Sequence, residues 1–177
     1  MINSRPNNKH YTQGNYLPVN RDKVIKFNAE NGVYFRSSWE RKVMIWLDHC
    51  DNVKRWGAEC MEIPYQTMET NEINHRYGDM TAHRYYPDFY YEIEDDDKKI
   101  TRVVVEVKPQ KEVDMTNAFL HKTLTVPEKS RALKNFEYDF KTAYKNAQKW
   151  NAIIKYCDKM GYEFVIMTET YINKINI

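Results

Sequence analysis

Three polar side chains near the middle of the 177-residue chain have the types and spacing of a metal-dependent hydrolytic site. Asp88 lies in the segment YYPDFYYEI, and Glu106 and Lys108 lie in VVVEVK. Neighbouring carboxylates resist joint ionisation, and a divalent cation that prefers oxygen ligands relieves that conflict. A lysine beside the cation adds positive charge, so the three residues together can bind a phosphodiester and activate water. The alternative is a solvated sheet surface with an ordinary ion pair.

A β-hairpin over residues 85–108 would bring these side chains together. Two segments rich in Tyr, Phe, Ile and Val flank the polar turn Asp95–Lys99, which is the pattern of two strands joined by a turn. With the turn centred on Asp97, residues equally far from it face each other, and Asp88 falls opposite Glu106. A shift of one residue would move the three valines of the second strand to the polar face of the sheet. We therefore expect the register in which Asp88 lies opposite Glu106. The acidic turn itself is expected to be solvated and not a metal site.

The composition is typical of one soluble globular domain. Hydrophobic residues make up 42% and charged residues 29%, with only 5 Gly and 6 Pro. The net charge of +2 creates no overall basic field, so any surface for nucleic acid must be local. The 3 cysteines are scattered, which fits a reducing compartment and gives no zinc motif. We find no signal peptide or long apolar segment and expect no contact with a membrane.

The chain is expected to divide into a basic, polar N-terminal arm at residues 1–31 and one domain at 32–177. The arm lacks a helical or strand period, so it is either mobile or laid across the surface. It could contact DNA phosphates or a partner protein, or be a passive tail. Nothing in the sequence marks a second domain or an internal repeat.

Two helices and four strands are expected to build the domain. The run SSWERKVMIWLDHC predicts a helix from Ser37, and an apolar stripe from Leu133 through Ile154 to Cys157 predicts a second helix. The expected strands are 53–66, the two strands of the hairpin, and 162–167, with a loop or small hairpin at 67–82 and a long connection at 110–130.

Glu40 admits two roles. Ser37 followed three residues later by Glu40 is a capping-box pattern, in which the carboxylate accepts a hydrogen bond from the backbone N–H of Ser37. In the other role, Glu40 points at the hairpin as a third carboxylate. The local pattern alone favours capping.

The order of elements resembles the restriction-endonuclease-like core of the PD-(D/E)XK nucleases. In that family an Asp lies on the second strand and E-x-K on the third, as Asp88 and Glu106–Lys108 do here, and a Glu on the first helix often joins them, in the place of Glu40. The resemblance implies an α/β (α+β) fold with a central mixed sheet of about four strands flanked by helices, in the order αβββαβ.

Four motifs narrow the resemblance: R-S-x-W-E, P-D-F, E-V-K-P and G-x-E-F-x-I-x-T-E. Between about Tyr34 and Glu169 the chain is similar to the TnsA-type branch of that superfamily, and within it to the head-completion nucleases of T-even-type tailed phages. The resemblance implies an endonuclease that hydrolyses DNA with Mg²⁺, for which Mn²⁺ can substitute, after the head is filled. It also implies the host cell cytoplasm or the virion as location, and portal, neck or head proteins as partners; a homo-oligomer is left open.

The resemblance further implies roles for single residues. Asp88 and Glu106 would bind magnesium, with the backbone carbonyl of Val107 and the carboxylate of Glu40 as further ligands. Lys108 would orient or activate the attacking water and stabilise developing negative charge. The candidate DNA contacts are Arg36, Arg84, Lys111 and Lys149, and Gln148 is a candidate for supporting the site from the second helix. Solvated surface positions are the alternative for the basic residues.

Two other functions stay open. The first is an assembly protein that keeps the nuclease fold and binds the portal, the neck or packaged DNA without cutting it. The second is a transposase-type or restriction-type nuclease acting at specific sites. Such enzymes often carry recognition domains, and 177 residues leave little room for one.

Overall fold

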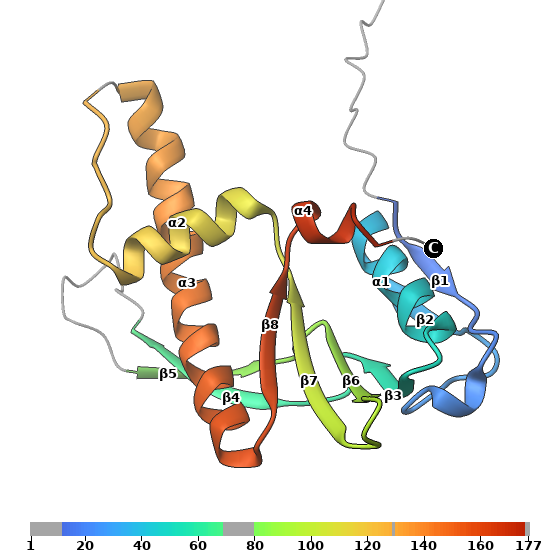
Figure 1. The fold of residues 1–177 in the computed structure, drawn as a ribbon. Helices are drawn as coiled ribbons and strands as arrows, with labels where there is room; N and C mark the ends of the chain where they lie inside the picture. The colour runs from blue at the N-terminus through green and yellow to red at the C-terminus, as the bar shows by residue number, and fades with distance from the viewer. Residues whose placement is uncertain (1–11, 69–79, 129, 176–177) are drawn as a thin grey trace, which may run out of the picture.

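A four-stranded mixed sheet forms the centre of the molecule (Figure 1). The computed structural model describes residues 12–68, 80–128 and 130–175. The sheet has the order β3-β6-β7-β8, in which β3, β6 and β7 are antiparallel and β8 is parallel to β7. Its strands are β3 (Val53–Ala58), β6 (Phe89–Glu94), β7 (Ile100–Val107) and β8 (Glu163–Met167). This arrangement confirms the expected restriction-endonuclease-like fold.

The central hairpin has the predicted register. Phe89 pairs with Val105 and Tyr91 pairs with Val103, so the residues on either side of Asp97 face each other as expected. Both faces of the hairpin are covered, however. The face of Phe89 and Val105 packs in one core cluster, and Tyr90 and Val104 pack in a second cluster.

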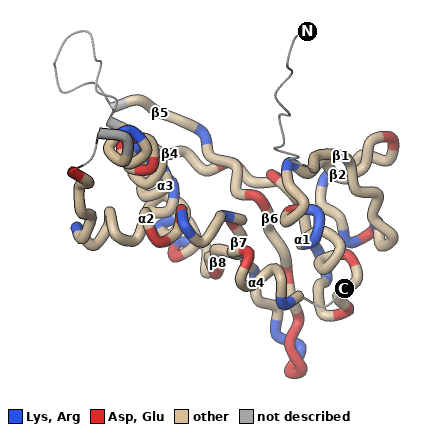
Figure 2. The backbone as a smooth tube through the Cα atoms, turned by 90° about the horizontal axis from the view of Figure 1, so that it is seen from above, with Lys and Arg blue, Asp and Glu red and all other residues tan. Residues whose placement is uncertain are grey.

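One helix covers each face of the sheet, as Figure 2 shows from above. Helix α1 (Ser38–His49) contributes Val43, Met44 and Leu47 to the first cluster. Helix α3 (Ser130–Met160) contributes Ile153 and Cys157 to the second. Hydrophobic burial of these two opposite faces fixes the sheet between the helices.

The apolar stripe of α3 differs from the prediction at two positions. Ile153 is fully buried, whereas Ile154, which the stripe included, is 45% exposed. Phe140 is 40% exposed because the first half of α3 projects beyond the sheet and packs against α2 (Gln110–Leu120), where Phe119 meets Phe140 edge to face. The apolar stripe of α3 therefore packs in two places: its second half packs on the central sheet, and its first half packs on α2.

Helix α2 occupies the first half of the long connection expected at 110–130. Pro109 stands at its N-cap, and the carboxylate of Glu169 accepts a hydrogen bond from the backbone N–H of Gln110 at 2.8 Å. Because that cap comes from the first residue of the C-terminal helix, 59 residues away, no local capping motif predicts the helix.

The expected strand at 53–66 divides into two. Glu59 adopts a positive φ of 43° between β3 and β4 (Ile63–Met68), and β4 leaves the central sheet to pair with β5 (Met80–Tyr85). This two-stranded ribbon packs on α3. Most of the loop or small hairpin expected at 67–82 falls on residues 69–79, which lie outside the described part of the chain. Within the ribbon, Ile63 pairs with Tyr85.

The described part of the N-terminal segment lies against the domain. Strand β1 (Gly14–Tyr16) pairs with β2 (Val33–Phe35), and a short 3₁₀ helix spans Arg21–Lys23. The buried carboxylate of Asp48 accepts hydrogen bonds from the Tyr16 hydroxyl and from the backbone of residues 19 and 20, at 2.7 to 2.9 Å. Burial alone would raise the pKa of Asp48, but these bonds lower it. Residues 1–11 lie outside the described part of the chain.

The C-terminal segment ends in a short helix, α4 (Glu169–Ile172), that packs near α1. Among the described residues, no helix has the length and apolarity to span a membrane.

Candidate active site

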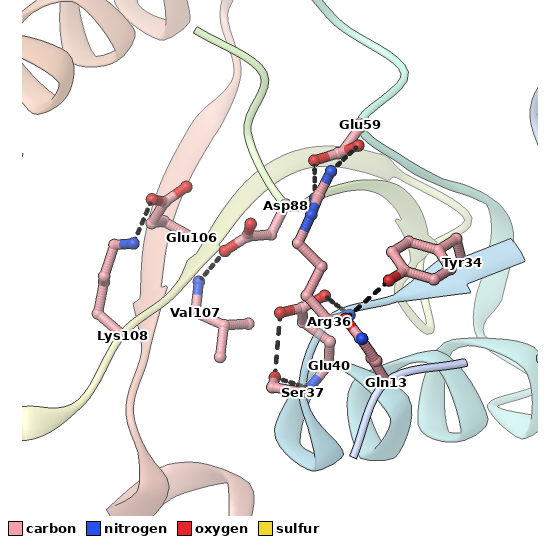
Figure 3. A network of polar contacts seen from close by, with 10 residues as sticks. All are labelled: Gln13, Tyr34, Arg36, Ser37, Glu40, Glu59, Asp88, Glu106, Val107 and Lys108. Carbon is pink, nitrogen blue, oxygen red and sulfur yellow. Dashed lines mark hydrogen bonds and ion pairs between the residues drawn. The ribbon is translucent and has the colours of Figure 1, made fainter. Parts of the chain in front are cut away.

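The end of the central hairpin brings Asp88, Glu106 and Lys108 together (Figure 3). Asp88 immediately precedes β6, and Glu106 lies one residue before the end of β7. One carboxylate oxygen of Asp88 (Oδ2) accepts a hydrogen bond from the backbone N–H of Val107 at 2.7 Å. The predicted register therefore sets Asp88 against the strand that carries Glu106.

Glu106 is held at both carboxylate oxygens. It is 2% exposed, its Oε1 lies 3.2 Å from the Lys108 ammonium nitrogen, and its Oε2 accepts a hydrogen bond from the Tyr85 hydroxyl. Burial and then the charge of Glu106 raise the pKa of Tyr85, so this residue stays a donor. Tyr85 was absent from the predicted site because the β4–β5 ribbon, not the hairpin, sets its orientation.

The carboxylates of Asp88 and Glu106 are close enough to repel each other. The pKa of Asp88 is raised from 3.8 to about 7, first by burial and then by the charge of Glu106, with a smaller contribution from Glu40. The hydrogen bond from Val107 and the charge of Lys108 oppose that rise. Burial would lower the pKa of Lys108, but Glu106 and Asp88 outweigh it and raise the pKa. Lys108 is therefore an ammonium group at neutral pH.

This donor set fits an ion such as magnesium. Within the described residues, no three His, Cys, Asp or Glu side chains come together as a metal-binding group. Structural zinc needs four protein ligands, whereas magnesium usually takes one or two carboxylates and fills its remaining positions with water and substrate phosphate. Burial and then the charge of Glu106 raise the pKa of Asp88, and a cation held by the two carboxylates would offset both effects.

Glu40 forms hydrogen bonds with Ser37 and Arg36 at the start of α1. The Ser37 hydroxyl accepts the Glu40 backbone N–H at 3.1 Å and lies 3.0 Å from the Glu40 Oε1. The Oε2 accepts the backbone N–H of Arg36 at 2.8 Å, where the capping box predicted that of Ser37. Glu40 is still close enough to contribute to the raised pKa of Asp88. Its role as a metal ligand, like that of the Val107 carbonyl, stays a prediction.

Arg36 lies at the same edge of the site, in an ion pair with Glu59. Both guanidinium nitrogens NH1 and NH2 contact the Glu59 carboxylate, the second at 3.2 Å. The backbone N–H of Glu59 donates to the carbonyl of Asp88 at 3.1 Å. The pKa of Arg36 is raised first by its hydrogen bond to Glu59 and further by the charges of Glu40 and Asp88. Sequence patterns carried no signal for Glu59.

Of the other candidate DNA contacts, some lie close to the candidate active site and others lie far from it. The Lys149 ammonium lies 4.9 Å from the centre of the Tyr85 ring, and burial, together with Lys108, lowers its pKa. Arg84 is exposed on the ribbon beside Glu62, and Lys111 pairs with Asp139 at 2.7 Å on the projecting helices. Gln148 lines a groove along α3. Contact of any of these residues with DNA stays a prediction.

A hairpin that carries Asp, Glu and Lys within an αβββαβ core defines a restriction-endonuclease-like nuclease domain. The family model of the TnsA-like endonuclease N-terminal domain matches residues 50–169, and the chain belongs to this family. The matched range includes Asp88, Glu106 and Lys108 and leaves out Glu40. The chain is also similar to the head completion nuclease of Enterobacteria phage T4, with 27% identity over 157 residues that cover 88% of this chain and 90% of that protein. Both findings confirm the predicted resemblance and support a nuclease role.

Proposed function

We propose that this protein is a magnesium-dependent DNA endonuclease that acts in phage head completion after DNA packaging. The observation that carries the proposal is the assembly of Asp88, Glu106 and Lys108 at one end of the hairpin, with the pKa of Asp88 raised to about 7. The similarity to the head completion nuclease of phage T4 supports the place in head completion. The protein would work inside the infected cell, on DNA held by portal, neck or head proteins.

Asp88 and Glu106 would hold the cation, with Mn²⁺ able to replace Mg²⁺. When bound, the ion supplies Lewis-acid stabilisation of the phosphoryl oxygens and a more acidic water. Tyr85 fixes the orientation of Glu106 through its hydroxyl. Val107 fixes Asp88 through its N–H, which leaves the second oxygen of Asp88 for the cation.

Lys108 would act on the phosphate. Its pKa is raised, so in the resting protein it donates hydrogen bonds and does not accept a proton. An ammonium beside Glu106 can hold a non-bridging phosphate oxygen and stabilise the charge that develops during hydrolysis. Glu40 and the Val107 carbonyl would complete the surroundings of the cation.

Calorimetry of magnesium binding tests the proposal. Wild-type protein is compared with Asp88→Ala/Glu106→Ala and with the control Asp96→Ala/Asp97→Ala, which removes two exposed carboxylates from the hairpin tip. We expect binding by the wild type and the control, loss of binding by the site variant, and the same pattern for Mn²⁺-dependent nicking of plasmid DNA. A folded wild type that binds no divalent cation, even with DNA, would leave the non-catalytic assembly protein as the function.

Head completion itself gives the second test. Loss of completed heads with Asp88→Ala or Lys108→Ala, in protein that still folds, would show that catalysis is needed. Preserved head completion would favour the assembly role. Cleavage confined to defined duplex sequences would favour the transposase-type or restriction-type alternative.

A further inference from the structure

A groove of about 650 Å³ runs between α3 and the β4–β5 ribbon. Its wall on the ribbon includes Pro64 and Gln66, and its wall on α3 includes Asn151, Lys155 and Lys159. None of the lining residues is acidic, and all of them lie in the described part of the chain. The groove is thus lined largely by apolar and uncharged polar groups, with positive charge on the α3 side.

The groove shares a wall with the candidate active site. Tyr85, whose hydroxyl holds Glu106, pairs in the ribbon with Ile63, and Ile63 lines the groove. On the opposite side, Gln148 lines the groove while the neighbouring Lys149 lies over the Tyr85 ring. The groove and the candidate site are therefore neighbours, joined on the ribbon by the Ile63–Tyr85 pair and on α3 by residues 148 and 149.

The charges of the groove favour a polyanion. Lys155 and Lys159 are one helical turn apart and lie on the same face of α3. Neither makes an ion pair with any residue that the structure describes. Lys149 and Lys145 continue the positive charge toward the site, since each adds to the field at the other. From Lys145 to Lys159 the helix rises about 21 Å.

The dimensions favour one strand and not a duplex. A volume of about 650 Å³ is that of a cleft that encloses a small organic ligand. One wall of the groove is a single helix and the other is a two-stranded ribbon. The space between these walls can accommodate a single polynucleotide strand. The amides of Gln66 and Asn151 and the half-buried ring of Tyr156 offer hydrogen bonds and stacking to unpaired bases, and the lysines offer contacts to phosphates.

We propose that this groove binds a single-stranded arm of the DNA substrate, so that the enzyme acts on duplexes that carry a flap or an overhang. The proposal rests on the endonuclease function proposed above and names its substrate class. The strand passes from the active site over Lys149 and along α3 to Lys159.

Fluorescence anisotropy measures DNA binding by the groove. The buffer contains a chelator, so that no divalent cation is available for cleavage. A blunt duplex is compared with the same duplex carrying a single-stranded arm, on either the 5′ or the 3′ side. We expect the arm to tighten binding to wild type by at least about tenfold. The variant Lys155→Gln/Lys159→Gln should lose this preference, and its slope of log affinity against log salt should fall by about 0.7 for each lost phosphate contact.

The matched control is Lys98→Gln/Lys99→Gln, which removes two charges from the hairpin tip. It should keep the preference for the arm. Equal binding of blunt and armed duplexes by the wild type, or an unchanged preference in the groove variant, would overturn the proposal.

Cleavage assays distinguish failure of the groove proposal from failure of the proposed endonuclease function. Plasmid nicking that needs Asp88 and Glu106, with no effect of an arm on binding or cutting, would refute the groove and retain the nuclease. Preference for the arm that depends on Lys155 and Lys159, without cleavage in magnesium, would retain the groove as a DNA-binding surface and refute the nuclease.

Discussion

Replacing Asp88 by asparagine should stabilise the protein in the absence of metal. The amide side chain would keep an oxygen that accepts the hydrogen bond from the Val107 N–H, and it would remove the charge that repels Glu106. The wild-type carboxyl has its pKa raised from 3.8 to about 7, first by burial and then by Glu106. Its ionisation at pH 8 therefore opposes folding.

The magnitude follows from that pKa. Each pKa unit corresponds to about 1.4 kcal/mol, so the ionisation of Asp88 costs the folded protein at most about 4 kcal/mol at pH 8. Because Asp88 is partly exposed, we expect about 2 kcal/mol or more. A raised folded-state pKa stabilises the fold below the ordinary value of 3.8, and this contribution is lost as the pH rises to about 7. The advantage of Asp88→Asn should grow over that range and stay level above it.

Urea unfolding of wild type, Asp88→Asn and the control Asp97→Asn measures the effect. Asp97 is exposed at the hairpin tip, so the control should match wild type at every pH. Magnesium should raise the free energy of unfolding of the wild type, by about 3 kcal/mol at a hundred times its dissociation constant, and leave Asp88→Asn unchanged. An Asp88→Asn protein that is no more stable than wild type at pH 8 without metal would refute the electrostatic reasoning about the site.

Three further predictions concern the residues around the carboxylates. Tyr85→Phe, which keeps the ring and removes the donor to Glu106, should weaken magnesium binding about 10- to 100-fold in calorimetry, and unchanged affinity would contradict the positioning role. Glu59→Gln releases Arg36, so it should lower KM for DNA with little change in kcat; a higher KM would show that the ion pair does not compete with phosphate. Ser37→Ala should cost about 1 kcal/mol in urea unfolding and leave magnesium affinity intact, whereas Glu40→Gln should lower that affinity; equal affinities in both variants would limit Glu40 to capping.

The core of the site could be predicted because its geometry is local. A turn at Asp97 and the alternation of Tyr and Val along two strands fix the parity of the hairpin, and parity sets Asp88 against Glu106. The same reasoning located α1 and most of α3. It erred between Ile153 and Ile154, because adjacent isoleucines both fit a spacing of three to four residues.

The surroundings of the site depend on contacts between distant segments. Tyr85 reaches Glu106 because β5 pairs with β4 outside the central sheet, and the turn that frees β4 begins at Glu59 in a left-handed conformation. Helix α2 starts at a cap supplied by Glu169. No pattern within a few residues of these positions encodes such partners, so the ribbon, the groove and the Arg36 ion pair emerged only from the folded chain.

If the proposed function is correct, we expect magnesium and DNA to bind cooperatively. Asp88 resists ionisation beside Glu106, so the protein alone disfavours the full negative charge that a cation needs. Lys149 has its pKa lowered by burial and by neighbouring lysines, so added positive charge is also disfavoured unless an anion accompanies it. A divalent cation and a phosphate that entered together would offset both effects, so each would strengthen the binding of the other by the same factor. Such coupling would confine the complete catalytic site to protein that already holds DNA.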